Sequence, residues 1–107
     1  MPRLKLTSLY CETTEDNAGP DEAYLVVNGK RVWGPESIND REPRPVDIEI
    51  DFSTSAKVRL YDQDTGVWDK DDYLGEITVS ANQAGQGEQQ DTFTEDDANY
   101  TLYYEVV

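Results

Sequence analysis

Five aspartates lie close together in the segment 62–75, which reads DQDTGVWDKDDYLG. They are Asp62, Asp64, Asp69, Asp71 and Asp72. Anionic side chains at this spacing repel one another in a folded loop, so either all of them face water or a cation lies between them. Carboxylate oxygens in a glycine-containing loop are typical ligands of hard cations, and Ca2+ is the common one. The segment is therefore a candidate metal-binding loop.

A second acidic segment, residues 12–22, reads ETTEDNAGPDE and precedes the apolar run 24–27. In a β-sandwich, loops that follow strands of the same direction gather at one end. Carboxylates from both segments would then surround one point, and divalent cations with six to eight oxygen ligands are its natural occupants.

Period-two alternation of apolar and polar residues dominates the chain, and no window of useful length has helical periodicity. Strands are predicted near 3–10, 24–27, 30–33, 46–52, 56–61, 75–80, 92–94 and 100–106, with a polar loop over 82–91. In the first strand, Leu4, Leu6 and Tyr10 are predicted to share one face. Short strands separated by turn residues are typical of antiparallel sandwiches. We therefore predict an all-β fold, an antiparallel eight-stranded β-sandwich, with residues 1–107 as one domain.

The dipeptide Asn28-Gly29 lies between two apolar runs. It is a strong hairpin signal, because both turn positions of a two-residue hairpin need positive φ. The implied register pairs Tyr24 with Trp33.

A second hairpin is predicted around residues 53–55. In its register Asp51 would face Lys57 and Glu49 would face Arg59. Two opposite-charge pairs on the solvated face support that register, and they give Lys57 and Arg59 a structural role.

The formal net charge is -14, from 23 acidic and 9 basic residues. A field of this sign repels nucleic acid, and it favours metal cations and basic partners; solubility or adaptation to high salt would also explain it. The chain has no His and one Cys, Cys11, which we expect to be buried. These counts exclude a disulfide framework, the usual zinc sites and catalysis by Ser-His-Asp or Cys-His groups. We therefore expect the protein not to be an enzyme.

No apolar run approaches membrane-spanning length, so no transmembrane segment is expected. The first residues, MPRLKL, lack the apolar core and cleavage site of a signal peptide. Either the protein is cytoplasmic or peripheral to a membrane, or it is exported by another route, or the chain is a fragment; the compartment stays open.

The first acidic segment resembles the first calcium loop of the C2 domain family, in which an Asp, a Gly, a second Asp and a Tyr precede an apolar strand. Asp16, Gly19 and Tyr24 match this pattern, and Glu22 stands where the family has its second Asp. Glu22 is one methylene longer, and Ala23 replaces the family's Pro, so the loop must relax to accommodate both.

The second acidic segment is similar to the third loop of the same family. Asp62 and Asp64 match its Asp-x-Asp pair, and residues 72–75 (DYLG) match its closing tetrapeptide. Similar strands lie between the two loops, so the resemblance covers nearly the whole chain.

The resemblance implies two Ca2+ ions bridged by shared carboxylates. The implied ligands are Asp16, Glu22, Asp62, Asp64 and Asp72. Asp69 and Asp71 lie in the extra length of a third loop longer than the family's, and they either add metal ligands or face water. For Glu15 and Asp21 we expect exposure to solvent. The alternative is a solvated acidic loop end in a module that has lost metal binding.

The resemblance also implies docking to phospholipid membranes when Ca2+ is bound, with the ions between carboxylates and lipid phosphate. Val67 and Trp68 lie at the tip of the third loop, and exposed apolar side chains there would suit insertion into the membrane interface. Trp68 could instead fold back onto the loop or the core. The alternative function is a calcium-stabilised protein- or carbohydrate-binding adhesion module without a membrane role, since sugar-binding sandwiches use flat exposed aromatic side chains.

Overall fold

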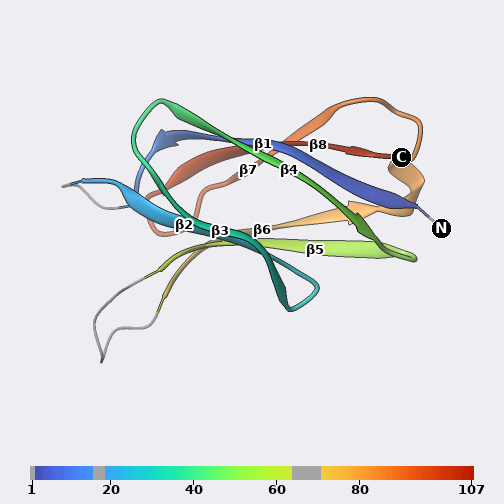
Figure 1. Ribbon diagram of the computed structural model, residues 1–107, viewed down its shortest axis with the longest axis horizontal. Coiled ribbons are helices and arrows are strands. Elements are labelled where there is room, and N and C mark those ends of the chain that lie inside the picture. The colour runs from blue at the N-terminus through green and yellow to red at the C-terminus, as the bar shows by residue number, and fades with distance from the viewer. Residues whose placement is uncertain (1, 16–18, 64–70) are drawn as a thin grey trace.

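The computed structural model describes residues 2–15, 19–63 and 71–107, which form two antiparallel sheets stacked face to face (Figure 1). The sheet that we call sheet I has the strand order β4-β1-β8-β7, and sheet II has the order β3-β2-β5-β6. The strands are β1 (Arg3–Thr13), β2 (Asp21–Val27), β3 (Lys30–Ile38), β4 (Glu42–Asp51), β5 (Ser55–Asp62), β6 (Asp72–Ser80), β7 (Gln89–Phe93) and β8 (Asn99–Val106). The prediction of an eight-stranded antiparallel sandwich is confirmed.

The single helical element in the described ranges is the 3-10 turn η1 (Ala81–Gln83), which begins one residue before the predicted loop 82–91. Strand β7 begins at Gln89, three residues earlier than predicted, so the loop is shorter at both ends. No helix of the described residues is long and apolar enough to cross a membrane.

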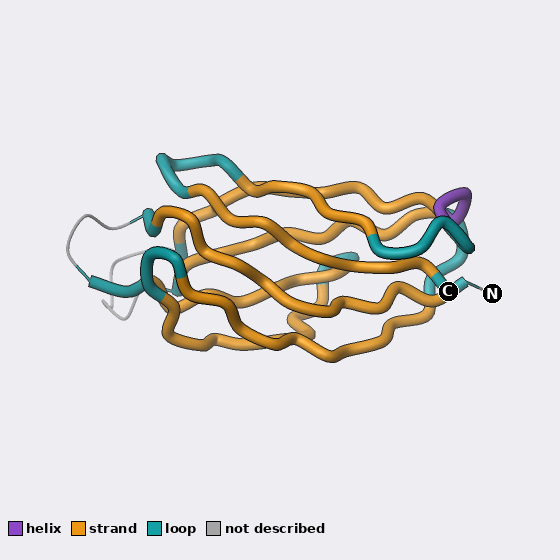
Figure 2. The backbone as a smooth tube through the Cα atoms, turned by 90° about the horizontal axis from the view of Figure 1, so that it is seen from above, coloured by secondary structure: helices purple, strands orange, loops and turns teal. Residues whose placement is uncertain are grey.

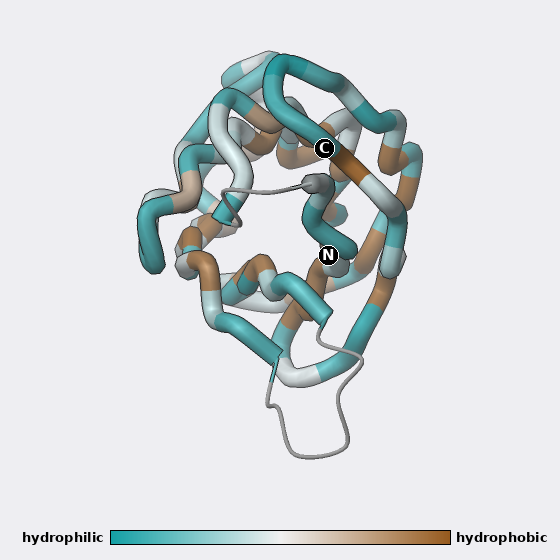
Figure 3. Tube along the Cα trace, turned by 90° about the vertical axis from the view of Figure 1, so that its left-hand side faces the viewer, coloured by the Kyte–Doolittle hydropathy of each residue, from teal (hydrophilic) through white to brown (hydrophobic). Residues whose placement is uncertain are grey.

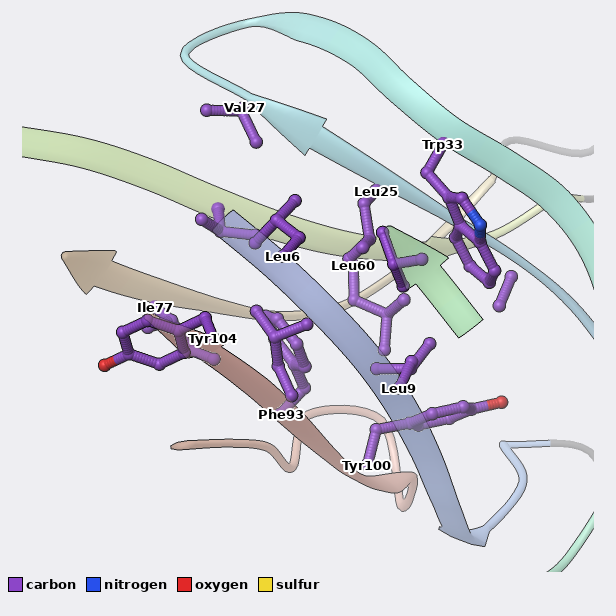
Figure 4. Close-up of a cluster of buried hydrophobic side chains, with 14 of the residues drawn as sticks. Leu6, Leu9, Leu25, Val27, Trp33, Leu60, Ile77, Phe93, Tyr100 and Tyr104 are labelled. Atoms are coloured by element: carbon purple, nitrogen blue, oxygen red, sulfur yellow. The ribbon is translucent and has the colours of Figure 1, made fainter. Parts of the chain in front are cut away.

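Apolar side chains from the inner faces of both sheets form one core (Figure 4). In β1 the inward residues are Leu4, Leu6, Leu9 and Cys11, all fully buried, because Thr7 is an extra residue in the pairing of β1 with β8. Such a bulge moves every following side chain to the other face. The prediction that Tyr10 shares the face of Leu4 was therefore wrong, whereas the predicted burial of Cys11 is confirmed.

The hairpin between β2 and β3 turns at Asn28 and Gly29, which have φ values of 50° and 86°. Both are positive, as predicted for a two-residue turn. The register prediction was wrong: Val26 pairs with Arg31, but Leu25 pairs with Trp33, because Val32 is an extra residue. The bulge brings Trp33 into the core, where 8% of the residue is exposed.

The second predicted hairpin does not exist, because β4 and β5 belong to different sheets. Asp51 lies opposite Arg3 and forms a 3.1 Å ion pair with it, whereas Arg59 pairs with Glu76 at 2.7 Å. The alternation of apolar and charged residues showed which strand faces are solvated. It did not show the partner strand, because any strand with charges of the opposite sign can pair favourably on such a face. The connection 52–54 crosses from one sheet to the other.

Strands β1, β3, β5 and β7 end at the same end of the sandwich. We call it the acidic end, and it carries the connections 14–20, 39–41, 63–71 and 94–98. The predicted gathering of both acidic segments at one end is confirmed. Both termini and η1 lie at the opposite end (Figures 1 and 2). There Arg3 and Val107 exchange two backbone hydrogen bonds of 2.8 and 2.9 Å.

Candidate metal centre

Two buried aspartates continue the inward rows of sheet II past the last apolar residues. Asp21 is the first residue of β2, on the same face as Ala23 and Leu25, and it is 0% exposed. Asp62 is the last residue of β5, on the same face as Leu60, and it is 2% exposed. Strand alternation thus places both carboxylates where the core meets the acidic end.

Backbone amides hold these carboxylates in place. The amide of Glu22 donates to Oδ1 of Asp62 at 2.8 Å, and the amide of Gln63 donates to the carbonyl of Glu22 at 2.8 Å. The amide of Glu15 donates to Oδ2 of Asp21 at 2.9 Å. Hydrogen bonds to an ionised acceptor are stronger than neutral ones, so the bases of both acidic connections are fixed to each other.

Among the residues that the structure describes, two groups of carboxylates at this end could hold a metal ion. Glu15, Asp21 and Asp62 offer one oxygen each, and these oxygens lie within 4.8 Å of one another. Glu15, Asp72 and Asp96 form a second group by the same measure. Glu15 belongs to both groups, so its carboxylate lies between them. Carboxylates alone are the ligand set of hard cations such as Ca2+ and Mg2+.

Asp96 comes from the turn between β7 and β8, which is bound to sheet II. It has a φ of 57°, and the neighbouring amide of Glu95 donates to the carbonyl of Leu74 at 3.0 Å. Aspartate tolerates this left-handed conformation better than most residues. The connection 94–98 therefore also contributes a carboxylate to the acidic end. Figure 3 looks onto this end, with hydrophilic segments around the ends of the sheets.

Two tyrosine hydroxyls each donate to a carboxylate of this end. Tyr100 donates to Oδ2 of Asp21 at 2.5 Å, and Tyr24 donates to Oδ2 of Asp71. Burial is the main cause that raises the pKa of Tyr100, and the hydrogen bond to Asp21 adds to it. For Tyr24, burial and then the bond to Asp71 raise the pKa to about 12. Both hydroxyls stay protonated donors at neutral pH.

Among the predicted ligands, Asp62 and Asp72 lie in the two groups. Glu22 is half-buried and alternates with Asp21 along β2, and its carboxylate is in neither described group. Asp71 is half-buried and accepts from Tyr24. The remaining predicted site residues lie outside the described residues: Asp16, Asp64, Val67, Trp68 and Asp69.

The prediction that Glu15 and Asp21 face solvent was wrong, because Glu15 is half-buried and Asp21 is fully buried. The period-two frame of Asp21, Ala23, Leu25 and Val27 already places Asp21 on the core face. Asp96 was also missed. Its signal is the acidic segment TEDD at 94–97 directly before the last strand, since antiparallel strands return to the same end at every second connection.

No family model and no curated protein matches this sequence. Solved structures do match. A chain described as "Structure of a C2 domain" has a TM-score of 0.62 and 15% identity, and the match covers 99% of this chain and 98% of that one. A chain with the two C2 domains of Extended-Synaptotagmin 2 matches with a TM-score of 0.65 and 16% identity, over 98% of this chain and 39% of that one. Human GIVD cytosolic phospholipase A2, solved with a fluorophosphonate inhibitor and terbium chloride, matches with a TM-score of 0.62 and 12% identity, over 99% of this chain and 16% of its own length.

The protein thus has the fold of a C2 domain, at a sequence identity of 15–16% to these structures. Within that fold, the described part of the chain has two groups of carboxylates at one end that could hold a metal ion.

Proposed function

We propose that this C2-like module binds Ca2+ at its acidic end and docks to phospholipid membranes when Ca2+ is bound. The observation that carries the proposal is the group of Glu15, Asp21 and Asp62, whose oxygens lie within 4.8 Å of one another and two of whose members are buried. Carboxylates this close repel strongly where water is excluded, and a divalent cation offsets that repulsion. The proposed role is binding, without a catalytic step.

Two ions are proposed, because two groups share Glu15. Asp21 and Asp62 would hold one ion, and Asp72 and Asp96 the other. Glu15 would then bridge the two cations, and the binding of both ions would depend on its side chain. When bound, Ca2+ would supply positive charge to which a lipid phosphate can coordinate.

Membrane attraction must be local to the acidic end. Two Ca2+ ions would change the formal charge of the protein from -14 to about -10, so the molecule as a whole is still repelled by anionic lipid. The proposal therefore requires that the ions and the apolar side chains of Val67 and Trp68 act together. The likeness in fold to Extended-Synaptotagmin C2 domains and to a cytosolic phospholipase A2 supports this choice of partner.

Vesicle sedimentation tests the proposal. Chelator-treated protein is mixed with vesicles of phosphatidylcholine and phosphatidylserine, then given Ca2+, Mg2+ or neither. We expect sedimentation with Ca2+ alone, and we expect it to be lost in Asp62→Asn. Asp51→Asn is the matched control, since Asp51 is an exposed aspartate near the opposite end, paired with Arg3. Equal sedimentation with and without Ca2+ would contradict the proposal.

A calcium-stabilised protein- or carbohydrate-binding module is the second candidate. One observation favours it: Tyr73 is 44% exposed on the outer face of sheet II, with its ring centre 5.8 Å from that of Tyr61. An exposed aromatic side chain beside another is a common contact for a sugar ring or an aromatic side chain of a partner. Protein that is stabilised by Ca2+ but never sediments with vesicles would favour this function.

A further inference from the structure

The hydroxyl of Tyr100 reaches the acidic end from within the core. Tyr100 is the second residue of β8, and it is 0% exposed. In Figure 4 it lies at one margin of the apolar cluster, with its hydroxyl oxygen pointing away from the other labelled side chains. That hydroxyl donates to Oδ2 of Asp21 at 2.5 Å.

This hydrogen bond joins the two sheets at the proposed metal site. Tyr100 belongs to sheet I, whereas Asp21 belongs to sheet II and lies 79 residues earlier in the chain. The same oxygen, Oδ2, also accepts from the amide of Glu15 at 2.9 Å. Two donors on one oxygen fix the plane of the carboxylate. A carboxylate held in this way needs less reorganisation when it ligates a cation.

A buried hydroxyl needs a hydrogen-bond partner, but that partner does not have to be a carboxylate of the proposed metal site. Tyr104 shows the contrast. It lies on the same strand, is 2% exposed, and its hydroxyl accepts from Nε2 of Gln83 at 3.2 Å, near the end opposite the acidic end. The two tyrosines share strand, burial and residue type, and they differ in whether their hydroxyl contacts the acidic end.

We propose that Tyr100 is a positioning residue of the calcium site, and that Asp21, rather than Glu22, is the carboxylate of the first acidic connection that it presents to the ion. This inference rests on the proposed function. Loss of a partner that orients a metal ligand typically weakens metal binding about 10-fold to 100-fold. We expect Tyr100→Phe to weaken Ca2+ binding by at least about 10-fold, and Tyr104→Phe to leave it within about threefold of the wild type.

Calorimetric titration of the chelator-treated full chain with Ca2+ measures these affinities. Two further measurements separate positioning from a general loss of structure. The luminescence lifetime of bound Tb3+ in H2O and D2O counts coordinated waters, and we expect a higher count in Tyr100→Phe, because a displaced Asp21 leaves a coordination position to water. In an Asp21→Asn background, Tyr100→Phe should weaken binding by no more than about threefold, since the group through which it acts is already altered.

The outcomes of these measurements distinguish a failure of the proposed function from a failure of the positioning role. A wild type that binds neither Ca2+ nor Tb3+ overturns the proposed function itself. A wild type that binds both, with Tyr100→Phe unchanged in affinity, overturns the positioning role alone, as does an equal loss in Tyr100→Phe and Tyr104→Phe. If Tyr100→Phe does not fold, Asp21→Asn is compared with Glu22→Gln. A loss of about 10-fold or more in Asp21→Asn alone supports the assignment, and the reverse order overturns it.

Discussion

The backbone amide of Glu22 and the carboxylate of Asp62 are joined by a 2.8 Å hydrogen bond across 40 positions of sequence. The amide of Gln63 returns a bond of 2.8 Å to the carbonyl of Glu22. These reciprocal bonds continue the pairing of Ala23 with Asp62 by one step beyond the ladder of β2 and β5. The bases of the two acidic connections are therefore hydrogen-bonded to each other, so a ligand that moves one of them would also move the other.

Asp62→Asn should abolish the stabilisation by the Ca2+ ion that Asp62 ligates. At 100 times its dissociation constant, a ligand adds roughly 2.7 kcal/mol to the free energy of unfolding for each independent site. The chelated variant should be no less stable than the chelated wild type, because a repelling charge is removed and Oδ1 of Asn can still accept the amide of Glu22. Denaturant unfolding with and without Ca2+ measures both quantities, with Asp51→Asn as the control. A full calcium effect in Asp62→Asn would show that this carboxylate is not a ligand.

Asp96→Asn should weaken the binding of one Ca2+ ion more than the binding of the other. Asp96 is exposed and belongs to the second group alone, so we expect a loss of roughly threefold to tenfold for one of two binding steps. Asp97→Asn is the matched control, since Asp97 is adjacent, exposed and also has a positive φ, but belongs to neither group. Calorimetry resolves the two steps. Equal effects of the two variants would mean that Asp96 acts only through general charge.

Val67→Ser combined with Trp68→Ser should weaken vesicle binding without changing the affinity for Ca2+. The reason is that burial of apolar side chains in the membrane interface contributes to docking, whereas neither side chain offers a metal ligand. Sedimentation and calorimetry on the same sample give the two quantities. Unchanged sedimentation would leave coordination of lipid phosphate by the ions as the whole attraction.

The fold class and the position of the site followed from residue patterns that act locally. Three of these patterns depend only on residues close in sequence: alternation along a strand, the Asn28-Gly29 turn and the two acidic segments. They could therefore be interpreted without knowing which strands pair. Strand pairing could not. The charges of Asp51 and Arg59 fit a shared hairpin, yet they pair with Arg3 and Glu76 in different sheets. Opposite charges indicate a solvated face and leave the partner undetermined.

The site residues show a second limit, which is set by single-residue shifts. Spacing aligned with a known family implied Glu22, together with Asp16, as a ligand of the first connection and left out Asp21, which strand β2 buries. In a strand, one position decides whether a side chain faces the core or the solvent. The extra residues Thr7 and Val32 had the same effect on Tyr10 and Trp33. The bulge at Thr7 does shift the phase of the apolar residues, from Leu4 and Leu6 to Leu9 and Cys11, but such a shift does not by itself show which residue is extra in the pairing.

Gly34→Ala should destabilise the protein more than Gly87→Ala. The two glycines have similar φ values of 85° and 80°, so the backbone cost of a side chain, about 1–2 kcal/mol, is shared. At Gly34 a Cβ would lie 2.9 Å from Cα of Tyr24 and closer still to the carbonyl oxygen of Ala23, whereas at Gly87 no atom lies within 4 Å. The close contact should add about 1–3 kcal/mol. Denaturant midpoints of the two variants check this, and equal losses would contradict it.

Alkaline pH should destabilise the protein. Burial raises the pKa of Cys11 from 9.0 to about 11, and burial with the bond to Asp71 raises that of Tyr24 to about 12. Below pH 9 the folded and unfolded states both hold these protons, and this stabilisation is fully present. Above pH 9 the unfolded state releases the thiol proton first, so the free energy of unfolding falls until about pH 11, by on the order of 2 kcal/mol for Cys11.

Urea unfolding in chelator between pH 8 and pH 11 measures this dependence. Cys11→Ala is the control variant. It should show a smaller decline between pH 9 and pH 10, the interval in which the thiol rather than the tyrosines accounts for most of the change. A free energy of unfolding that stays constant up to pH 11 would contradict the assigned pKa shifts.

Arg3 and Val107 are hydrogen-bonded neighbours at the end of the sandwich opposite the acidic end. A biotin or a fluorescent protein attached beside either residue would therefore lie at the end opposite the acidic end. Immobilised on a sensor chip in this way, every copy would present its acidic end outward, toward ions or vesicles in the flow. The same adjacency makes the chain suitable for cyclisation, since a short peptide could link Arg3 and Val107 without passing over the acidic end.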